Sequence, residues 1–214
     1  MWSYNDTMPP HVSDPDQDED EEPLEDQAEY DSVGLILAEL FRGSILLLQI
    51  STKKGALQDP DAEIYSNAAF GVGLLVEHST QDLSPQYSLL LSALLPLFEI
   101  APGSPSSKMT AHDNAAGAVG RIIVRNTTAV PLEQVLPIFI GALPLTNDFL
   151  ENRPVFRALF HLFRVYPTAL TPYMEKLLSV FGHVLDPSLP DQLGTESRSE
   201  LVTLMASVRL SKYP

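Results

Sequence analysis

Residues 67–75 read NAAFGVGLL, and residues 114–122 read NAAGAVGRI. Both segments open with an asparagine and two alanines and continue with small and apolar residues at helical spacing. They start 47 residues apart, and a weaker copy, NRPVFRALF, follows at residues 152–160, a further 38 residues along the chain. Recurrence of this kind indicates an internal structural repeat.

An apolar stretch follows each copy, as expected if the two together form a helical hairpin. These stretches cover residues 87–98, 132–143 and 173–185, and a last apolar helix is predicted over residues 199–210. Small residues such as Ala68 and Ala115 would let one helix approach its neighbour closely. The leucine-rich row between residues 90 and 95 would fill the grooves between helices.

One hairpin cannot bury its apolar face alone, so successive hairpins have to stack. A period near 40 residues is typical of HEAT and armadillo repeats. The sequence therefore predicts an all-α fold, a HEAT-repeat α-solenoid of stacked antiparallel hairpins, over residues 55–214. Residues 59–61 and 111–113 place aspartates where helix N-termini are expected, and residues 102–107 are predicted to form a longer loop.

The charge of the chain is concentrated at its N-terminus. The formal net charge is −15, and residues 1–32 carry 12 of the 28 acidic residues but none of the 13 lysines and arginines. We predict a disordered acidic arm here, because this segment has too little apolar surface to offset the entropy lost on ordering. The arm is either a solvated linker or a tail that engages a basic partner. The negative charge argues against nucleic acid as a ligand.

Residues 33–54 form a second segment, predicted to be helical but of uncertain place in the fold. Its apolar part is about as long as a membrane span, but Glu39, Arg42 and Gln49 interrupt it. Charged side chains at bilayer depth are costly, so a buried helix is favoured and no membrane partner is expected.

No residue pattern predicts an enzyme, a cofactor site or a metal site. The chain has no cysteine, its five histidines lack metal-ligand spacing, and no nucleophile motif is present. Residues Gly71, Val72 and Gly73 lie inside a helical pattern, so close helix packing explains them better than a nucleotide-binding loop. His161 is expected to be a hydrogen-bonded histidine of the core or the surface.

The recurring asparagines are the polar feature that points to binding. Asn67, Asn114 and Asn152 occupy equivalent places in successive hairpins, so stacking would align them in a ladder. An asparagine can clamp the backbone of an extended peptide, but it can equally cap a helix or tie one repeat to the next. Nearby acids could add lysine-binding pockets or serve only as solvated surface residues; they are Asp113, Asp148 and Glu151.

Several consecutive segments resemble the importin-β (karyopherin-β) family of nuclear transport receptors, in particular its C-terminal HEAT repeats. The segments, in order, are residues 59–63, 66–73 with 77–78, 113–122, 135–137, 142–148 and 151–152. The likeness covers roughly residues 56–210, and the ordered run of segments is more specific than any single motif.

The resemblance implies a function in nuclear import, with a place in both cytoplasm and nucleus. In this family the inner helices bind basic protein cargo such as histone tails and ribosomal proteins, and the small GTPase Ran releases it. If this carries over, the candidate cargo-binding residues are Asn67, Asp113, Asn114, Asp148, Glu151 and Asn152.

A complete receptor of this family has many more repeats than this chain has room for, and the repeats that bind Ran are expected to be missing. We therefore expect a fragment, a truncated product or an imperfect gene model. The alternative function is that of a general HEAT-repeat scaffold or adaptor that joins other proteins.

Overall fold

The computed structural model describes residues 62–212, with side chains through residue 207. The predicted acidic arm (1–32) and the helical segment at 33–54 lie outside the described residues. Within residues 62–212 every regular element is a helix. The α-helices are α2 (Ala62–His78), α3 (Tyr87–Leu94), α4 (Ser106–Arg125), α5 (Leu132–Gly141), α6 (Asn152–Val165), α7 (Pro167–Leu170), α8 (Met174–Val184) and α9 (Gly194–Lys212). Short 3-10 helices are η1 (Ser84–Gln86), η2 (Leu95–Glu99), η3 (Thr127–Ala129), η4 (Phe149–Glu151) and η5 (Thr171–Tyr173).

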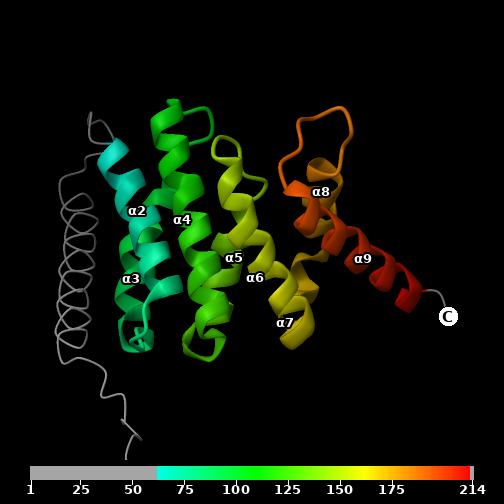
Figure 1. Cartoon of the computed structure of the whole chain (residues 1–214), viewed down its shortest axis with the longest axis horizontal. Coiled ribbons are helices and arrows are strands. Elements are labelled where there is room, and N and C mark those ends of the chain that lie inside the picture. The colour runs from blue at the N-terminus through cyan, green and yellow to red at the C-terminus, as the bar shows by residue number, and fades with distance from the viewer. Residues whose placement is uncertain (1–61, 213–214) are drawn as a thin grey trace, which may run out of the picture. The chain divides into compact units, whose positions relative to one another are not determined.

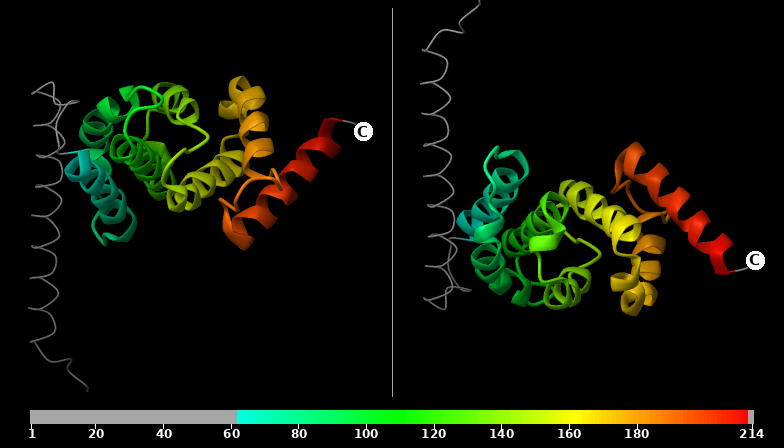
Figure 2. Two further views of the ribbon diagram at one scale, coloured as in Figure 1. Left: turned by 90° about the horizontal axis from the view of Figure 1, so that it is seen from above. Right: turned by 90° about the horizontal axis from the view of Figure 1, so that it is seen from below.

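The described helices pack in two layers, as the repeat pattern predicts. Helices α2, α4, α6 and α9 each contact the next in the first layer (Figure 1). Helices α3, α5 and α8 return antiparallel to them and form the second layer, which is seen most clearly in Figure 2. The predicted all-α HEAT-type solenoid is confirmed for these repeats.

Small residues set the close spacing within the first layer. A Cβ added to Gly73 of α2 would lie 3.0 Å from the Cα of Ala118 in α4. One added to Gly120 of α4 would lie 2.8 Å from the carbonyl oxygen of Pro154 in α6. Close packing of helices, which the sequence predicted for Gly73, is confirmed, and it explains why larger side chains are absent at these contacts.

The leucine row of α3 divides between the core and the surface. Leu90 and Leu94 are fully buried in the core that runs from α2 to α9, whereas Leu91 is half-buried and Leu95 is exposed. Each fully buried leucine contributes about 1.5–3 kcal/mol. The prediction that all four leucines fill grooves is therefore correct for two of them.

Three predicted boundaries are wrong. The last helix, expected over 199–210, begins earlier, at Gly194. The helix expected over 87–98 is α-helical only to Leu94, because Pro96 has no N–H to donate, and the chain continues as the 3-10 helix η2. Helix α4 begins at Ser106, not near Asp113, so the predicted loop at 102–107 ends at Pro105. Gly103, with a φ of 80°, turns the chain early, and the carbonyl of Pro105 accepts the first bonds of the helix.

None of the described helices is both long enough and apolar enough to cross a membrane.

Candidate interaction surface

The six candidate residues come from the first layer and from the connection that leads into α6. Asn67 lies on α2, Asp113 and Asn114 on α4, and Asp148, Glu151 and Asn152 at or just before the start of α6. Asn67 is exposed and Asp148 is half-buried. The other four are at least 95% buried, so they offer almost no surface to a ligand.

The buried asparagines tie repeats together. Asn114 donates from Nδ2 to the backbone oxygen of Ser66 at 3.1 Å and to its Oγ at 2.9 Å, which joins α4 to α2. Asn152 donates to the backbone oxygen of Gln192, just before α9, at 3.2 Å. Asn67 is exposed, so the three asparagines do not share one environment and do not form the uniform ladder expected from the sequence. The interpretation that the asparagines tie one repeat to the next is correct for Asn114 and Asn152.

Asp113 organises the connection between α5 and α6. Its Oδ2 accepts hydrogen bonds from the backbone N–H groups of Thr146, Asn147 and Asp148 at 3.1, 2.7 and 2.9 Å. Its Oδ1 lies 3.1 Å from Nδ1 of His112. A carboxylate that accepts several backbone N–H bonds is satisfied inside the protein. Asp113 therefore has neither the exposure nor the free lone pairs of a lysine-binding residue.

Glu151 belongs to a buried ionic cluster that the sequence did not predict. Arg121 of α4 donates to both carboxylate oxygens of Glu151, from Nη1 at 2.5 Å and from Nη2 at 3.2 Å. The Nε of Arg121 donates to Glu77 of α2 at 2.9 Å, and Arg157 of α6 donates to the other oxygen of Glu77 at 2.6 Å. The cluster joins three successive helices of the first layer with two charges of each sign.

The environment of the cluster shifts the pKa values of its members. Burial acts to raise the pKa of Glu77, but hydrogen bonds and charges from Arg157 and Arg121 outweigh it and hold the pKa below its ordinary value. Burial raises the pKa of Glu151, with Arg121 acting against it. Burial disfavours the charge on Arg121, yet its two glutamate partners raise its pKa. The arginine therefore stays charged, as a buried bidentate pair requires.

Two further residues complete the surroundings of Arg121. The guanidinium lies 5.6 Å from the ring centroid of Phe70 on α2, within the range of a cation–π contact. A Cβ on Gly117 would lie only 1.5 Å from Oε2 of Glu151, so a glycine is needed to admit the carboxylate. The sequence signal for this cluster was present in the run GAVGR at residues 117–121. Only the fold shows that its glycines make room for an ion pair.

Three acids lie on the connections at one edge of the layers. Figure 1 shows at its top the connections that lead from the second layer into α4, α6 and α9. These connections carry the half-buried Asp148 and Asp186 and the exposed Asp191. Hydrogen bonds from the Ser188 side chain and backbone lower the pKa of Asp186, and those from the Leu193 backbone and the Arg198 side chain lower that of Asp191. Both carboxylates are ionised at neutral pH, but Asp191 is already paired with Arg198, whose Nη2 lies 3.0 Å from its Oδ1.

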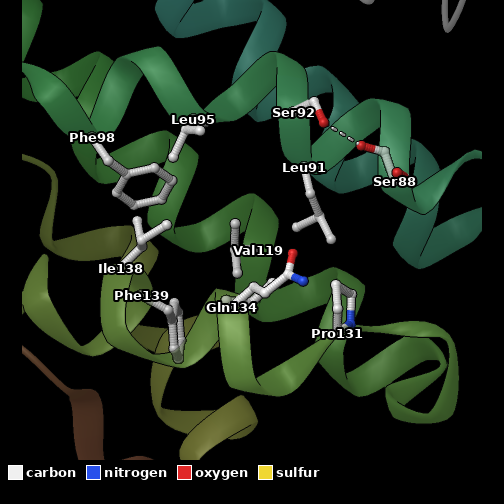
Figure 3. Close-up of a pocket in the computed structure, with 11 residues that line it drawn as sticks. Ser88, Leu91, Ser92, Leu95, Phe98, Val119, Pro131, Gln134, Ile138 and Phe139 are labelled. Atoms are coloured by element: carbon white, nitrogen blue, oxygen red, sulfur yellow. Dashed lines mark hydrogen bonds between the residues drawn. The ribbon is translucent and has the colours of Figure 1, made fainter.

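A pocket of about 140 Å³ lies in the second layer, between α3 and α5 (Figure 3). Leu91, Leu95 and Phe98 line it on one side, Ile138 and Phe139 on the other, and Val119 of α4 lies at its base. Ser88, Ser92 and Gln134 also line it, but the lining is mainly apolar, so the pocket suits an apolar side chain.

Among residues 62–212 no three His, Cys, Asp or Glu side chains are grouped to hold a metal ion. His161 accepts or donates a hydrogen bond at 2.8 Å to the Oγ1 of Thr127, which confirms its predicted structural role.

The sequence is similar to proteins named as importins. It is 39% identical over 165 residues to the probable importin subunit beta-4 of Schizosaccharomyces pombe, which covers 74% of this chain and 15% of that protein. It is 31% identical over 134 residues to Importin-4 of Homo sapiens, covering 62% of this chain and 12% of that protein. It is 27% identical over 149 residues to Importin-4 of Mus musculus, covering 69% of this chain and 13% of that protein. No protein-family model matches the sequence. The chain thus spans about one seventh of the length of these relatives.

Proposed function

Because this chain belongs to the importin-β family, we propose that its helical repeats bind a basic protein cargo for transport between cytoplasm and nucleus. The observation that carries the proposal is the match to a probable importin subunit beta-4 over 74% of the chain, on repeats that form the two-layered fold. Histone tails and ribosomal proteins are the proposed cargo classes, since both are rich in lysine and arginine. The proposed role is binding, not catalysis.

The proposed contact residues are Asn67 and Asp148, the two candidates whose side chains reach the surface. Asp148 accepts one hydrogen bond at Oδ1, from the backbone N–H of Leu150 at 3.1 Å, which leaves its Oδ2 for a lysine. Asp186, on the connection into α9, adds negative charge at the same edge, whereas the charge of Asp191 there is compensated by Arg198. Contacts of this exposed kind are individually weak, about 0.2–1 kcal/mol. Several together are needed for useful affinity.

The buried candidates support this surface indirectly in the proposal. Asp113 holds the backbone of Asp148 through the N–H bond at 2.9 Å. Glu151 and Asn152 fix the start of α6, which follows that loop directly. Their replacement would disturb cargo binding through the fold, so they are unsuitable probes of direct contact.

The test is binding of a fluorescent, lysine-rich histone-tail peptide by the full chain, measured by anisotropy at low and high salt. We expect salt-sensitive binding that Asp148→Asn weakens about threefold, the size of one exposed ion pair. Glu133→Gln, on the second layer, removes the same charge and is the matched control. Asparagine keeps the acceptor oxygen for Leu150, so the loop should remain folded.

Absence of salt-sensitive binding, or an equal effect of both substitutions, would overturn the assignment of cargo to this surface. Addition of Ran loaded with GTP tests the second part: we propose that binding by this chain alone is independent of Ran. Stable co-purification with neutral or acidic subunits instead would favour the scaffold function, for which the apolar pocket between α3 and α5 is a suitable contact.

A further inference from the structure

One ion pair in the cluster links helices that are not neighbours in the stack. Glu77 lies at the end of α2 and Arg157 in the middle of α6, and α4 packs between these two helices. The Nη1 of Arg157 nevertheless reaches Oε1 of Glu77 at 2.6 Å. In a solenoid each repeat normally contacts only the adjacent repeats. This pair therefore links α2 directly to α6 and restrains the angle between them in addition to the packing of each helix against α4.

The pair is also the accessible part of the cluster. Arg157 is 51% exposed, whereas Arg121 is 8% and Glu151 only 2% exposed. The buried pair of Arg121 and Glu151 joins α4 to the start of α6 and does not need Arg157. Glu77 keeps Arg121 as a partner when Arg157 moves away. The outer pair can therefore open without leaving an unpaired buried charge, the costly outcome of breaking a buried ion pair.

We propose that Arg157 and Glu77 form a latch that holds three successive repeats at one curvature and releases them when the pair is broken. The latch is a property of the repeats themselves and does not depend on cargo binding. Because Arg157 is half exposed, the latch is open to screening by salt, over a Debye length of about 8 Å at physiological ionic strength. The inner pair of Arg121 and Glu151 persists under the same conditions.

The latch predicts a measurable change in the angle between α2 and α6. The chain has no cysteine, so the double substitution Ile64→Cys and Val165→Cys directs two spin labels to exposed positions on these helices. The positions lie at opposite ends of their helices, so the distance between labels reports the crossing angle. Pulsed electron–electron double resonance at low salt should give a narrow distribution of distances between the two labels. Adding Arg157→Gln should broaden this distribution and increase the mean distance.

Arg153→Gln is the matched control, because Arg153 lies one turn earlier on α6, is exposed and makes no ion pair among the described residues. It should leave the distribution unchanged. High salt should broaden the distribution of the parent and add nothing to that of Arg157→Gln. An unchanged distribution in Arg157→Gln at low salt, or the same change in Arg153→Gln, would overturn the latch. Circular dichroism establishes that each variant keeps its helical content, and failure of cargo binding would leave this test untouched.

Discussion

Gly117 shows how one missing side chain admits a charged group to the interior. It lies on α4, where Oε2 of Glu151 occupies the space that a Cβ would need. The carboxylate in turn meets Arg121, one turn further along the same helix. The glycine is therefore required by a contact between repeats and not by backbone conformation, since its φ is not positive.

Gly117→Ala should lower the free energy of unfolding by more than about 2 kcal/mol, because the methyl group would displace Glu151 and leave Arg121 poorly paired. Urea denaturation of the full chain measures the effect. Gly182 of α8 is the control: a Cβ there meets nothing within 4 Å, so Gly182→Ala should stabilise by about 0.5–1 kcal/mol. Equal effects at the two glycines would contradict the packing argument.

At the scale of elements, α4 acts as the support of the connection between α5 and α6. Asp113 lies in the second turn of α4, not at its start, and binds three consecutive backbone N–H groups of that connection. Asn147 adds a bond from Nδ2 to the backbone oxygen of Ser106 at 3.2 Å, near the start of α4. These bonds position Asp148, the half-buried residue proposed for cargo contact.

Asp113→Ala should therefore loosen the connection more than the rest of the fold. A fully buried N–H group left without an acceptor costs about 1–3 kcal/mol. These three bonds are only partly buried, so access of water makes the loss smaller. Hydrogen exchange should accelerate most at Thr146, Asn147 and Asp148. Asp186→Ala removes an aspartate whose acceptor role is confined to Ser188 two residues away, and it should leave exchange at 146–148 unchanged. Uniform acceleration over all helices in Asp113→Ala would refute this role of α4.

At the scale of the described repeats, charge and packing act together. Helices α2, α4 and α6 are close enough for the cluster around Arg121 because Gly73 and Gly120 remove side chains from their contacts. The same closeness buries Glu151 and lets Arg157 reach Glu77. Stability of the stack should therefore depend on the ionisation of these glutamates.

The pKa of Glu77 is lowered in the folded chain, so its ionised form stabilises the fold above the ordinary value of 4.5. This contribution is lost as the pH falls from 4.5 through the lowered pKa. Glu151, whose pKa is raised by burial, acts in the opposite sense, and its contribution is lost as the pH rises. The urea concentration at the midpoint of unfolding, measured between pH 7 and pH 3, should decrease toward the acid end of this range. This decrease should be smaller in Glu77→Gln. Glu133→Gln controls for the loss of one carboxylate, and an equally steep fall in Glu77→Gln would contradict the linkage.

The repeat, the all-α fold and the family followed from the sequence alone. Small residues at 67–73 and 114–120 alternate with apolar residues at helical spacing, and that local pattern dictates both helix formation and close packing. Helix ends were less predictable, because Gly103 and Pro105 start α4 earlier than Asp113 suggested. The sequence pattern identified the acids and asparagines, but it did not predict which of them are buried and which are exposed.

The sequence by itself thus determined which segments are helices, that they stack, and which polar side chains recur. Only the tertiary structure decided what those side chains do. Asn114 reaches Ser66 across 48 positions, and Glu77 reaches Arg157 across 80. Hydrophobic periodicity fixes the face that a helix buries, but it does not fix which residue of another repeat stands opposite a given polar atom. That pairing depends on helix spacing and angle, which the glycines of α2 and α4 set only once the repeats are assembled.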